Sequence, residues 1–154
     1  MTNEDNVPGL AGDAEFLQLL AGSYHRLLGS PLCEIDWGPE WLYLEAPFAV
    51  LAHNTEPDPR FVYANRCAQQ WFGYSWEEFT QLRSRLSAEA PEQAERDRLL
   101  QSVTATGFVT GYTGRRITKS GARFWIQDGV IWQLRWDDGT VCGQAAMFRS
   151  RRPG

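Results

Sequence analysis

The stretch FVYANRCAQQWFGYSWEEF, residues 61–79, decides the fold that this sequence predicts. It opens with strand-forming residues, turns at Asn65 into a short helix, breaks at Gly73 and restarts as a helix after Ser75. Asn65 carries a side chain that caps the first turn of a helix, so we assign it a structural capping role. Seven aromatic residues in this stretch are too many for a segment that faces solvent. We therefore expect a core or a pocket here.

Length and composition indicate one globular domain. The chain has 154 residues, of which 43% are hydrophobic and 13% aromatic, with seven tryptophans that suit a wide interior. The net charge of −4 is uneven, because residues 1–60 hold ten acidic residues against two arginines, whereas residues 61–154 carry a net +4. The basic residues are scattered among acids apart from Arg149, Arg151 and Arg152, which we interpret as a solvated basic tail. We therefore expect no nucleic-acid binding.

The cysteines and the hydropathy indicate a reduced, cytoplasmic compartment. Cys33, Cys67 and Cys142 are far apart, without a CxxC motif or a signal peptide, as expected of reduced thiols. No apolar run approaches the ~18 residues of a membrane span, so no membrane association is expected. The cysteines, His25 and His53 lack the spacing of metal ligands, and no metal site is predicted.

The region before the predicted sheet contains an amphipathic helix. Residues 1–12 are polar and rich in glycine and proline, and we expect them to be mobile. Asp13 can cap a helix that runs to Leu28, with Gly29 placed to end it. Its apolar stripe either packs on the protein's own domain or forms a homodimer. A connector then runs to residue 38. The main domain is predicted to span residues 39–149, and the basic tail residues 150–154.

Five strands and several helices make an α+β fold. Strands are predicted at 48–53, 61–64, 108–118, 124–136 and 141–148, and the longest helix of the main domain at 91–106. The strands do not alternate with crossover helices, so one antiparallel sheet with helices packed on one face fits best. Asp128 interrupts the apolar alternation of the long strand. Either Asp128 is buried and paired, or Asp128 and Gly129 form a β-bulge that resets the register, which is the interpretation we favour.

Two phrases resemble PAS domains in the expected order. VYANRCAQQWFGYSWEEF resembles the segment where an Asn ends the second strand and a helix follows, and KSGARFWI resembles the hairpin before the long strand. More closely, LYLEAPFAVLAHNTEPDPRFVYANRCAQQWFGYSWEEF, SRLSAE, GFVTGYTGRRITKSGARFWI and GQAAMF resemble the MEKHLA family, a PAS-like branch. The resemblance covers about residues 40–149. It implies a PAS-like fold, in the short form typical of bacterial members rather than the plant homeodomain–leucine-zipper form.

A PAS-like fold implies a space between the sheet and the short helices. Either a small ligand occupies it or the side chains fill it themselves. His53 and Asn54 end a strand beside an acidic turn, and Gln144 could bond a planar ring, so a ligand contact is conceivable for each of these three. The residues expected around this space are Leu51, His53, Asn54, Tyr63, Trp71, Phe72, Leu86, Leu100, Phe108, Tyr112, Trp132, Gln144 and Met147.

Flavin and haem are both disfavoured as cofactors. The reactive Cys of light-sensing flavin PAS domains lies in an NCRFLQ phrase, whereas Cys67 lies earlier, in ANRCAQQ, and no such phrase follows. PAS haem sensors usually take their His from the helical side, whereas His53 ends a strand. The linker Arg83–Ser87 with Arg115, Arg116 and Lys119 could bind an anion or could be a solvated, ion-paired surface.

No nucleophile and base occur in a catalytic arrangement, so we expect a non-enzyme. The leading hypothesis is a cytoplasmic, PAS-like sensory or regulatory domain for signalling. It would bind a small ligand, a protein partner or both, and, with no output segment after the last strand, act in trans through the helix Asp13–Leu28 or the exposed sheet face. The alternative is a protein-interaction or dimerisation module with a filled core. A small enzyme is the least favoured reading.

Overall fold

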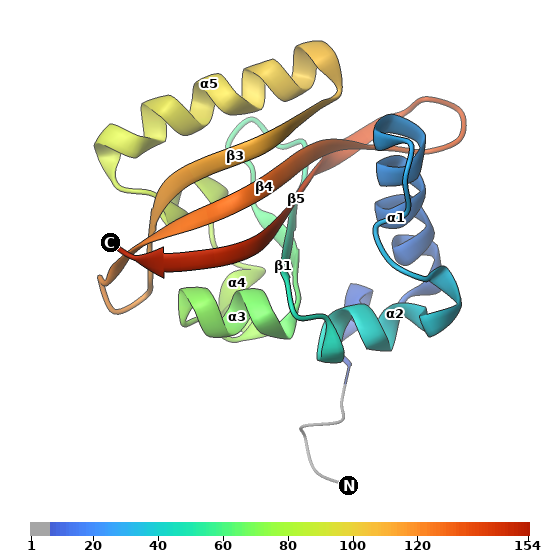
Figure 1. Ribbon diagram of the computed structural model, residues 1–154, viewed down its shortest axis with the longest axis horizontal. Coiled ribbons are helices and arrows are strands. Elements are labelled where there is room, and N and C mark those ends of the chain that lie inside the picture. The colour runs from blue at the N-terminus through green and yellow to red at the C-terminus, as the bar shows by residue number, and fades with distance from the viewer. Residues whose placement is uncertain (1–6) are drawn as a thin grey trace, which may run out of the picture.

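The fold is α+β, as predicted. The computed structural model describes residues 7–154; residues 1–6 of the predicted mobile N-terminus lie outside the described residues. Figure 1 shows the sheet with helices at its edges and behind it. The helices are α1 (Ala14–Leu28), α2 (Gly38–Glu40), α3 (Arg66–Phe72), α4 (Trp76–Phe79) and α5 (Ala90–Thr106). Short helical segments are η2 (Gly9–Gly12), η3 (Ile35–Trp37), η4 (Trp41–Glu45) and η5 (Ser84–Ser87).

Within residues 7–154 the strands form one antiparallel five-stranded sheet. They are β1 (Ala49–His53), β2 (Phe61–Ala64), β3 (Phe108–Ile117), β4 (Arg123–Arg135) and β5 (Val141–Pro153). Their order across the sheet is β2-β1-β5-β4-β3, so the last strand in sequence lies at the centre between β1 and β4. This arrangement brings the N-terminal hairpin and the C-terminal strands into one sheet.

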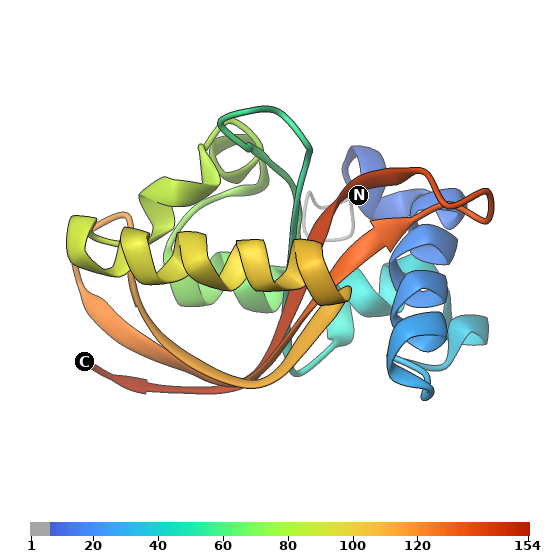
Figure 2. The same cartoon turned by 90° about the horizontal axis from the view of Figure 1, so that it is seen from above.

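The sheet has two faces with different partners. The inner face packs against α3, α4 and α5, with Phe72, Phe79 and Val103 fully buried against it. Figure 2 shows α5 lying along this side of the curved sheet, while α1 stands at its other end. The outer face packs against α1 through a second buried cluster that includes Leu20 and Trp132. The two faces therefore bury two separate hydrophobic cores.

The apolar stripe of α1 packs on the protein's own sheet. Phe16, Leu17, Leu20 and Tyr24 are buried, and Asp13 accepts a hydrogen bond from the backbone N–H of Glu15 as the predicted cap. The stripe is thus used within the chain, which was one of the two predicted alternatives. A homodimer through this helix would have to use its polar side and stays a prediction.

The predicted bulge at Asp128 is present. Asp128 has φ 53°, and β4 has one more residue than β3 between Ile126 and Gly129. Its side chain is exposed and lies 3.6 Å from the guanidinium of Arg149. As a result Ile126 faces the inner core, whereas Trp132 faces the outer one. The bulge alternative was right, and the buried alternative was wrong.

Two ends of the chain are more ordered than the sequence indicated. β5 continues to Pro153, and Arg152 pairs with Trp125 of β4, so residues 150–153 are part of the sheet, while their side chains are exposed to solvent. Near the N-terminus, Gly9–Gly12 forms a helical turn whose Ala11 is buried. Both segments gain order from partners that lie far away in the sequence. Over residues 7–154, we find no helix with the length and apolarity that crossing a membrane requires.

Candidate functional site

A small cavity lies between the inner face of the sheet and α5. Its volume is about 50 Å³, which holds a few water-sized positions. The walls come from β1, β2, β3, β4, β5, η5 and α5. The lining residues are Leu51, Ala52, His53, Phe61, Ser87, Arg96, Leu99, Leu100, Arg116, Ile131, Gln144, Ala145, Ala146 and Phe148. Among the described residues, no acidic side chain lines this cavity.

The structure brings only part of the predicted pocket together. Leu51, His53, Leu100 and Gln144 line the cavity, and Asn54 lines a groove of about 330 Å³ beside it. The groove and the cavity share His53, Leu100 and Gln144 as walls, so the two spaces lie next to each other.

Four other residues that were predicted to line the pocket lie elsewhere on the inner side or at the surface. Phe72 and Tyr112 belong to the inner core but do not line the cavity. Trp71 packs at the edge of that core, where Arg151 lies 5.3 Å above its ring. Leu86 is 43% exposed. None of these four forms a wall of the cavity.

The remaining four predicted residues belong to the opposite face, which corrects the predicted grouping. Tyr63, Phe108, Trp132 and Met147 pack in or against the outer core next to α1. For Trp132 the reason is the bulge at Asp128, and for Phe108 it is the register shift near Gly111, which has φ 65°. Each irregularity moves the neighbouring residues of its strand to the other face.

Asn65 does cap α3, as predicted, and it does more. Its Oδ1 accepts from the backbone N–H groups of Ala68 and Val50, each at 3.0 Å. Its Nδ2 donates to the carbonyl oxygens of Leu42 and Phe48 at 3.1 and 3.0 Å. Because the side chain is completely buried, Asn65 ties β1, η4 and α3 together in the core.

Two arginines are buried at the cavity. Arg96 of α5 and Arg116 of β3 are each 6% exposed. Arg96 donates to the hydroxyl of Ser84, and its Nη1 lies 3.7 Å from the largely exposed carboxylate of Asp97. Burial and, as the second cause, the positive charge of Arg116 lower the pKa of Arg96 to about 10, so the two guanidinium groups repel each other.

Arg116 is held by an aromatic ring and by carbonyl and hydroxyl groups. Its guanidinium lies 5.6 Å from the centre of the Tyr112 ring, and Nη2 donates to the Tyr112 hydroxyl at 3.2 Å. Nη1 donates to the carbonyl oxygen of Arg115. Tyr112 in turn donates to the carboxylate of Glu95 at 2.8 Å. In the described part of the chain, no carboxylate lies within 4.0 Å of Arg116 itself, so its charge is only indirectly compensated.

His53 and Gln144 present unused hydrogen-bond acceptors. His53 Nδ1 donates to the carbonyl of Asn54 at 2.9 Å, which leaves Nε2 of the neutral ring as an acceptor. Gln144 Nε2 donates to the Leu100 carbonyl and the Thr104 hydroxyl, which leaves Oε1 free. Within residues 7–154, neither His53 Nε2 nor Gln144 Oε1 has a hydrogen-bond partner, although both are buried. Such atoms call for a ligand or water.

Arg96 was not among the residues predicted for the site, and Arg116 was predicted to lie with a group of surface residues. A signal was present for each. Arg96 shares the helical spacing of the inward residues Leu99, Leu100 and Val103, and Arg116 lies four residues after the inward Tyr112, on the same face of β3. In both elements, a charged residue at an inward and otherwise apolar position was the signal that indicated a site.

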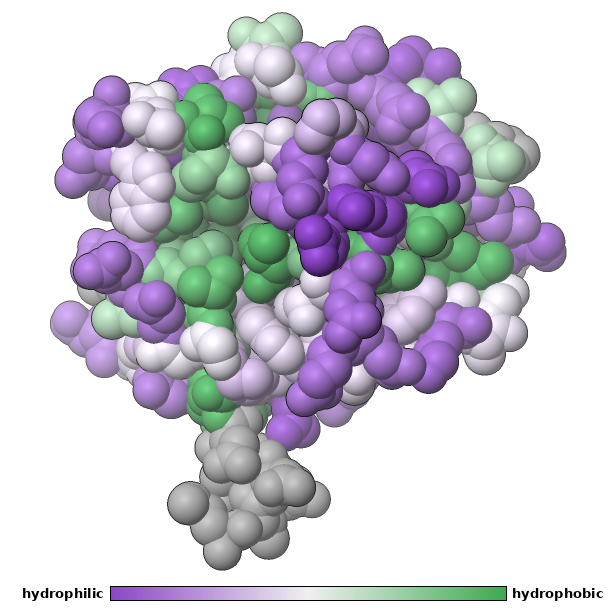
Figure 3. All heavy atoms as spheres, turned by 180° about the vertical axis from the view of Figure 1, so that it is seen from behind, coloured by the Kyte–Doolittle hydropathy of each residue, from purple (hydrophilic) through white to green (hydrophobic). Residues whose placement is uncertain are grey.

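The predicted anion-binding surface separates into ion pairs and the cavity. Arg83 and Arg85 pair with Glu56 and Asp58 at the protein surface, and Lys119 pairs with Glu78. Arg115 lies 4.0 Å from Glu92. In Figure 3 hydrophilic residues gather near the centre of the back face, the side to which the β1–β2 loop projects. Two residues of this predicted surface, Arg116 and Ser87, line the cavity.

The inner side does not fit a flavin. The cavity is far below the ~300 Å³ at which ordinary ligand pockets begin. Buried rings such as Phe72 and Phe124 take up the neighbouring space. Cys67 lies on α3 outside the cavity, and burial raises the pKa of its thiol. Over residues 7–154, no cluster of three or more His, Cys, Asp and Glu side chains could hold a metal ion.

Burial at the cavity makes His53 a contributor to acid sensitivity. Burial lowers its pKa from 6.5 to about 4, and the charge of Arg96 acts in the same direction. Unfolding restores the ordinary pKa, so the unfolded chain binds more protons between pH 6.5 and 4. We expect the wild type to lose roughly 2–3 kcal/mol of unfolding free energy over this range relative to His53→Gln. Urea unfolding of both proteins at several pH values tests this, and equal pH dependence would contradict it.

Solved structures similar to this chain include PAS and LOV domains. The PAS domain of a protein from Colwellia psychrerythraea is 17% identical with a TM-score of 0.59, over 73% of this chain and 90% of that one. An RNA-binding Light-Oxygen-Voltage receptor is 23% identical with a TM-score of 0.59, over 69% of this chain and 30% of that one. The Aureochrome1 LOV domain is 19% identical with a TM-score of 0.54, over 65% and 72%. These likenesses show a PAS-like fold.

The family is shown by the sequence itself. A comparison with curated proteins finds no match. The MEKHLA domain matches residues 14–152, which include α1, a helix that the sequence analysis had placed before the domain. The match and the fold agree with the predicted resemblance, and the chain belongs to the MEKHLA domain family.

Proposed function

We propose that this PAS-like domain is a sensor that binds a small molecule in the cavity between β1, β5 and α5. PAS domains generally serve as sensory or regulatory modules, which leaves the ligand and the output to be assigned. The observation that carries the proposal is the buried, unpaired Nε2 of His53 and Oε1 of Gln144 in the walls of the cavity. Buried acceptors are normally satisfied by a ligand, a protein donor or an ordered water, and a small ligand with donor groups would satisfy these two.

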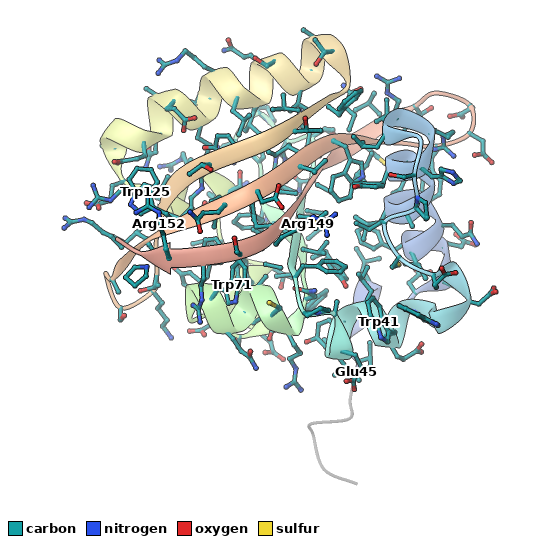
Figure 4. The ribbon with its side chains drawn as sticks, viewed as in Figure 1. Trp41, Glu45, Trp71, Trp125, Arg149 and Arg152 are labelled. Atoms are coloured by element: carbon teal, nitrogen blue, oxygen red, sulfur yellow. The ribbon has the colours of Figure 1, made fainter. Side chains whose placement is uncertain are left out.

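The output is proposed to be protein contact on the uncovered part of the outer face. Trp125 carries arginine side chains there, with Arg152 4.9 Å and Arg115 5.9 Å from its ring centre. Figure 4 shows Trp125 and Arg152 side by side, with Arg149 farther along β5. β5 contains both Gln144 at the cavity and Arg152 on this face, so one strand connects ligand and output surface.

The second candidate is an interaction or dimerisation module without a ligand. It is favoured by the same surface of Trp125, Arg115 and Arg152, because aromatic and arginine side chains are enriched in protein interfaces. A homodimer or an unidentified protein partner would then use this face, and the cavity would hold water. Neither candidate requires catalysis, and we propose that the domain is not an enzyme.

Native mass spectrometry of freshly purified protein separates the two candidates. The matched variant is Ala146→Leu. Ala146 lines the cavity beside Ile131, and the larger leucine side chain fills part of the cavity. A sensor is expected to carry a small molecule that the variant lacks. The bare mass in the wild type, or the same bound molecules in both proteins, would contradict the sensor. The same spectra give the oligomeric state, which tests the proposed homodimer.

A further inference from the structure

The chemistry of the cavity walls is strongly biased toward one charge. Arg96 and Arg116 bring two positive charges into a space whose walls hold no acidic side chain among the described residues. Burying a charge costs several kcal/mol unless it is paired and hydrogen-bonded. The nearest compensation is peripheral, because Asp97 is 62% exposed and Glu95 reaches Arg116 only through the Tyr112 hydroxyl. A negative charge inside the cavity would compensate both arginines.

The same walls also need a hydrogen-bond donor. His53 Nε2 and Gln144 Oε1 can only accept, since Nδ1 of His53 and Nε2 of Gln144 already donate to other groups. A purely acceptor anion would satisfy the arginines and leave these atoms unpaired. A hydroxyl group near the negative charge would satisfy one of them.

The size of the cavity limits the ligand to a few non-hydrogen atoms. About 50 Å³ corresponds to roughly three to five water positions. This excludes nucleotides, flavins and lipids, and it suits short organic acids. The half-buried Leu99 and Leu100 and the buried Ile131 add apolar wall next to the polar atoms.

We propose that the cavity binds a short 2-hydroxycarboxylate, with its carboxylate on Arg96 and Arg116 and its hydroxyl donating to His53 Nε2 or Gln144 Oε1. The inference rests on the proposed sensor function and names the class of ligand. Guanidinium groups are the preferred partners of carboxylates, and hydrogen bonds between charged groups are about twice as strong as neutral ones. The carboxylate of the bound ligand would therefore offset the electrostatic repulsion between Arg96 and Arg116.

The first experiment uses the wild-type chain and four probes. Glycolate, acetate, the neutral glycolamide and inorganic phosphate are titrated by calorimetry and by thermal unfolding. Glycolate is expected to bind and to raise the melting temperature, acetate to bind more weakly, and glycolamide to have no effect. Binding of glycolamide as tight as that of glycolate, or no binding of any anion, would overturn the inference. Acetate binding as tightly as glycolate would overturn the proposed contact of the ligand hydroxyl. Phosphate binding more tightly than glycolate would overturn the choice of a carboxylate as the anion.

Three variants locate the site. Arg96→Gln and Arg116→Gln are expected to weaken glycolate binding at least about tenfold, since each removes a charged hydrogen bond. Arg123→Gln makes the same change of charge on β4, where Arg123 is exposed and pairs with Glu89, and should keep wild-type affinity. Unchanged glycolate binding in both Arg96→Gln and Arg116→Gln would overturn the inference.

A measurement on the wild type keeps the test valid if the arginine variants do not fold. The chain has two histidines, so ring signals of His53 and the exposed His25 can be followed by NMR. Glycolate in the cavity is expected to raise the pKa of His53 from about 4 and to leave His25 unchanged. An unmoved His53 under saturating glycolate would count against the site. A retained neutral or cationic molecule that Ala146→Leu excludes would leave the sensor function standing and refute only the anion.

Discussion

Asn65→Ala is expected to lower the free energy of unfolding by about 4 kcal/mol. The substitution removes the cap of α3 and also leaves the N–H of Val50 and the carbonyls of Leu42 and Phe48 without partners in the core. Each buried polar group left without a partner costs about 1–3 kcal/mol. Urea unfolding followed by tryptophan fluorescence and circular dichroism measures the loss.

The control for Asn65 is Ser75, which caps the neighbouring helix α4. Ser75 and Glu78 form a capping box at the protein surface. Ser75→Ala removes a cap alone and should cost about 1 kcal/mol. Asn65→Asp keeps the accepting oxygen but loses both donated bonds, and it should cost clearly more than Ser75→Ala. If Asn65→Ala and Ser75→Ala cost the same, the role of Asn65 is limited to capping.

Trp132→Ala is expected to cost about 4 kcal/mol and to detach α1 from the sheet. The side chain is completely buried, its indole N–H donates to the carbonyl of Leu20 at 3.1 Å, and its ring meets that of Tyr24 edge to face at 5.0 Å. Removing it leaves a cavity between β4 and α1 and takes away the hydrogen bond that Trp132 donates to the Leu20 carbonyl. Hydrogen exchange should then show faster exchange in Ala14–Leu28 than in α5.

Two other tryptophan variants serve as controls. Trp132→Phe keeps a ring against Tyr24 and loses only the bond to Leu20, so an intermediate cost of about 1–2 kcal/mol is expected. Trp125 lies on the uncovered part of the outer face, so Trp125→Ala should lower the free energy of unfolding by less than about 1 kcal/mol. Wild-type exchange rates in α1 of Trp132→Ala would show that the helix is held by other contacts.

The two variants also separate stability from function. Asn65 and Trp132 lie outside the walls of the cavity, so ligand binding by the folded fraction should be unaffected by either. Arg116→Gln is expected to behave in the opposite way. It removes a poorly compensated buried charge, and its main effect falls on binding. Comparing these variants therefore distinguishes residues that build the fold from residues that build the site.

Local patterns were sufficient for the elements of this fold. Asn65, Gly73 and Ser75 are residue types with strong preferences at helix ends, and they occupy the expected positions. The Asp128 bulge was also predictable, because a charged residue before glycine interrupts a run of alternating apolar residues. Such signals act over a few residues, so the sequence reports them directly.

The site was less predictable, because it depends on which residues share a face. Tyr63, Phe108, Trp132 and Met147 are large and apolar, and the sequence alone did not separate the core under α1 from the core under α5. Two bulges move the strand residues between these faces. A charged residue such as Arg96 looks like a solvent-facing position of a helix until its neighbours on the sheet are known.

The sequence by itself therefore determined the α+β class, the family, the helix caps and the bulge at Asp128, because each depends on short-range preferences or on a recognisable phrase. Only the tertiary structure decided that α1 packs on its own sheet, that β5 extends to Pro153, and that Arg96, Arg116, His53 and Gln144 meet at one cavity. The physical reason is that burial and charge compensation depend on groups from α5, β1, β3 and β5. β1, the consecutive pair α5 and β3, and β5 are far apart in the chain and come together only in the folded domain.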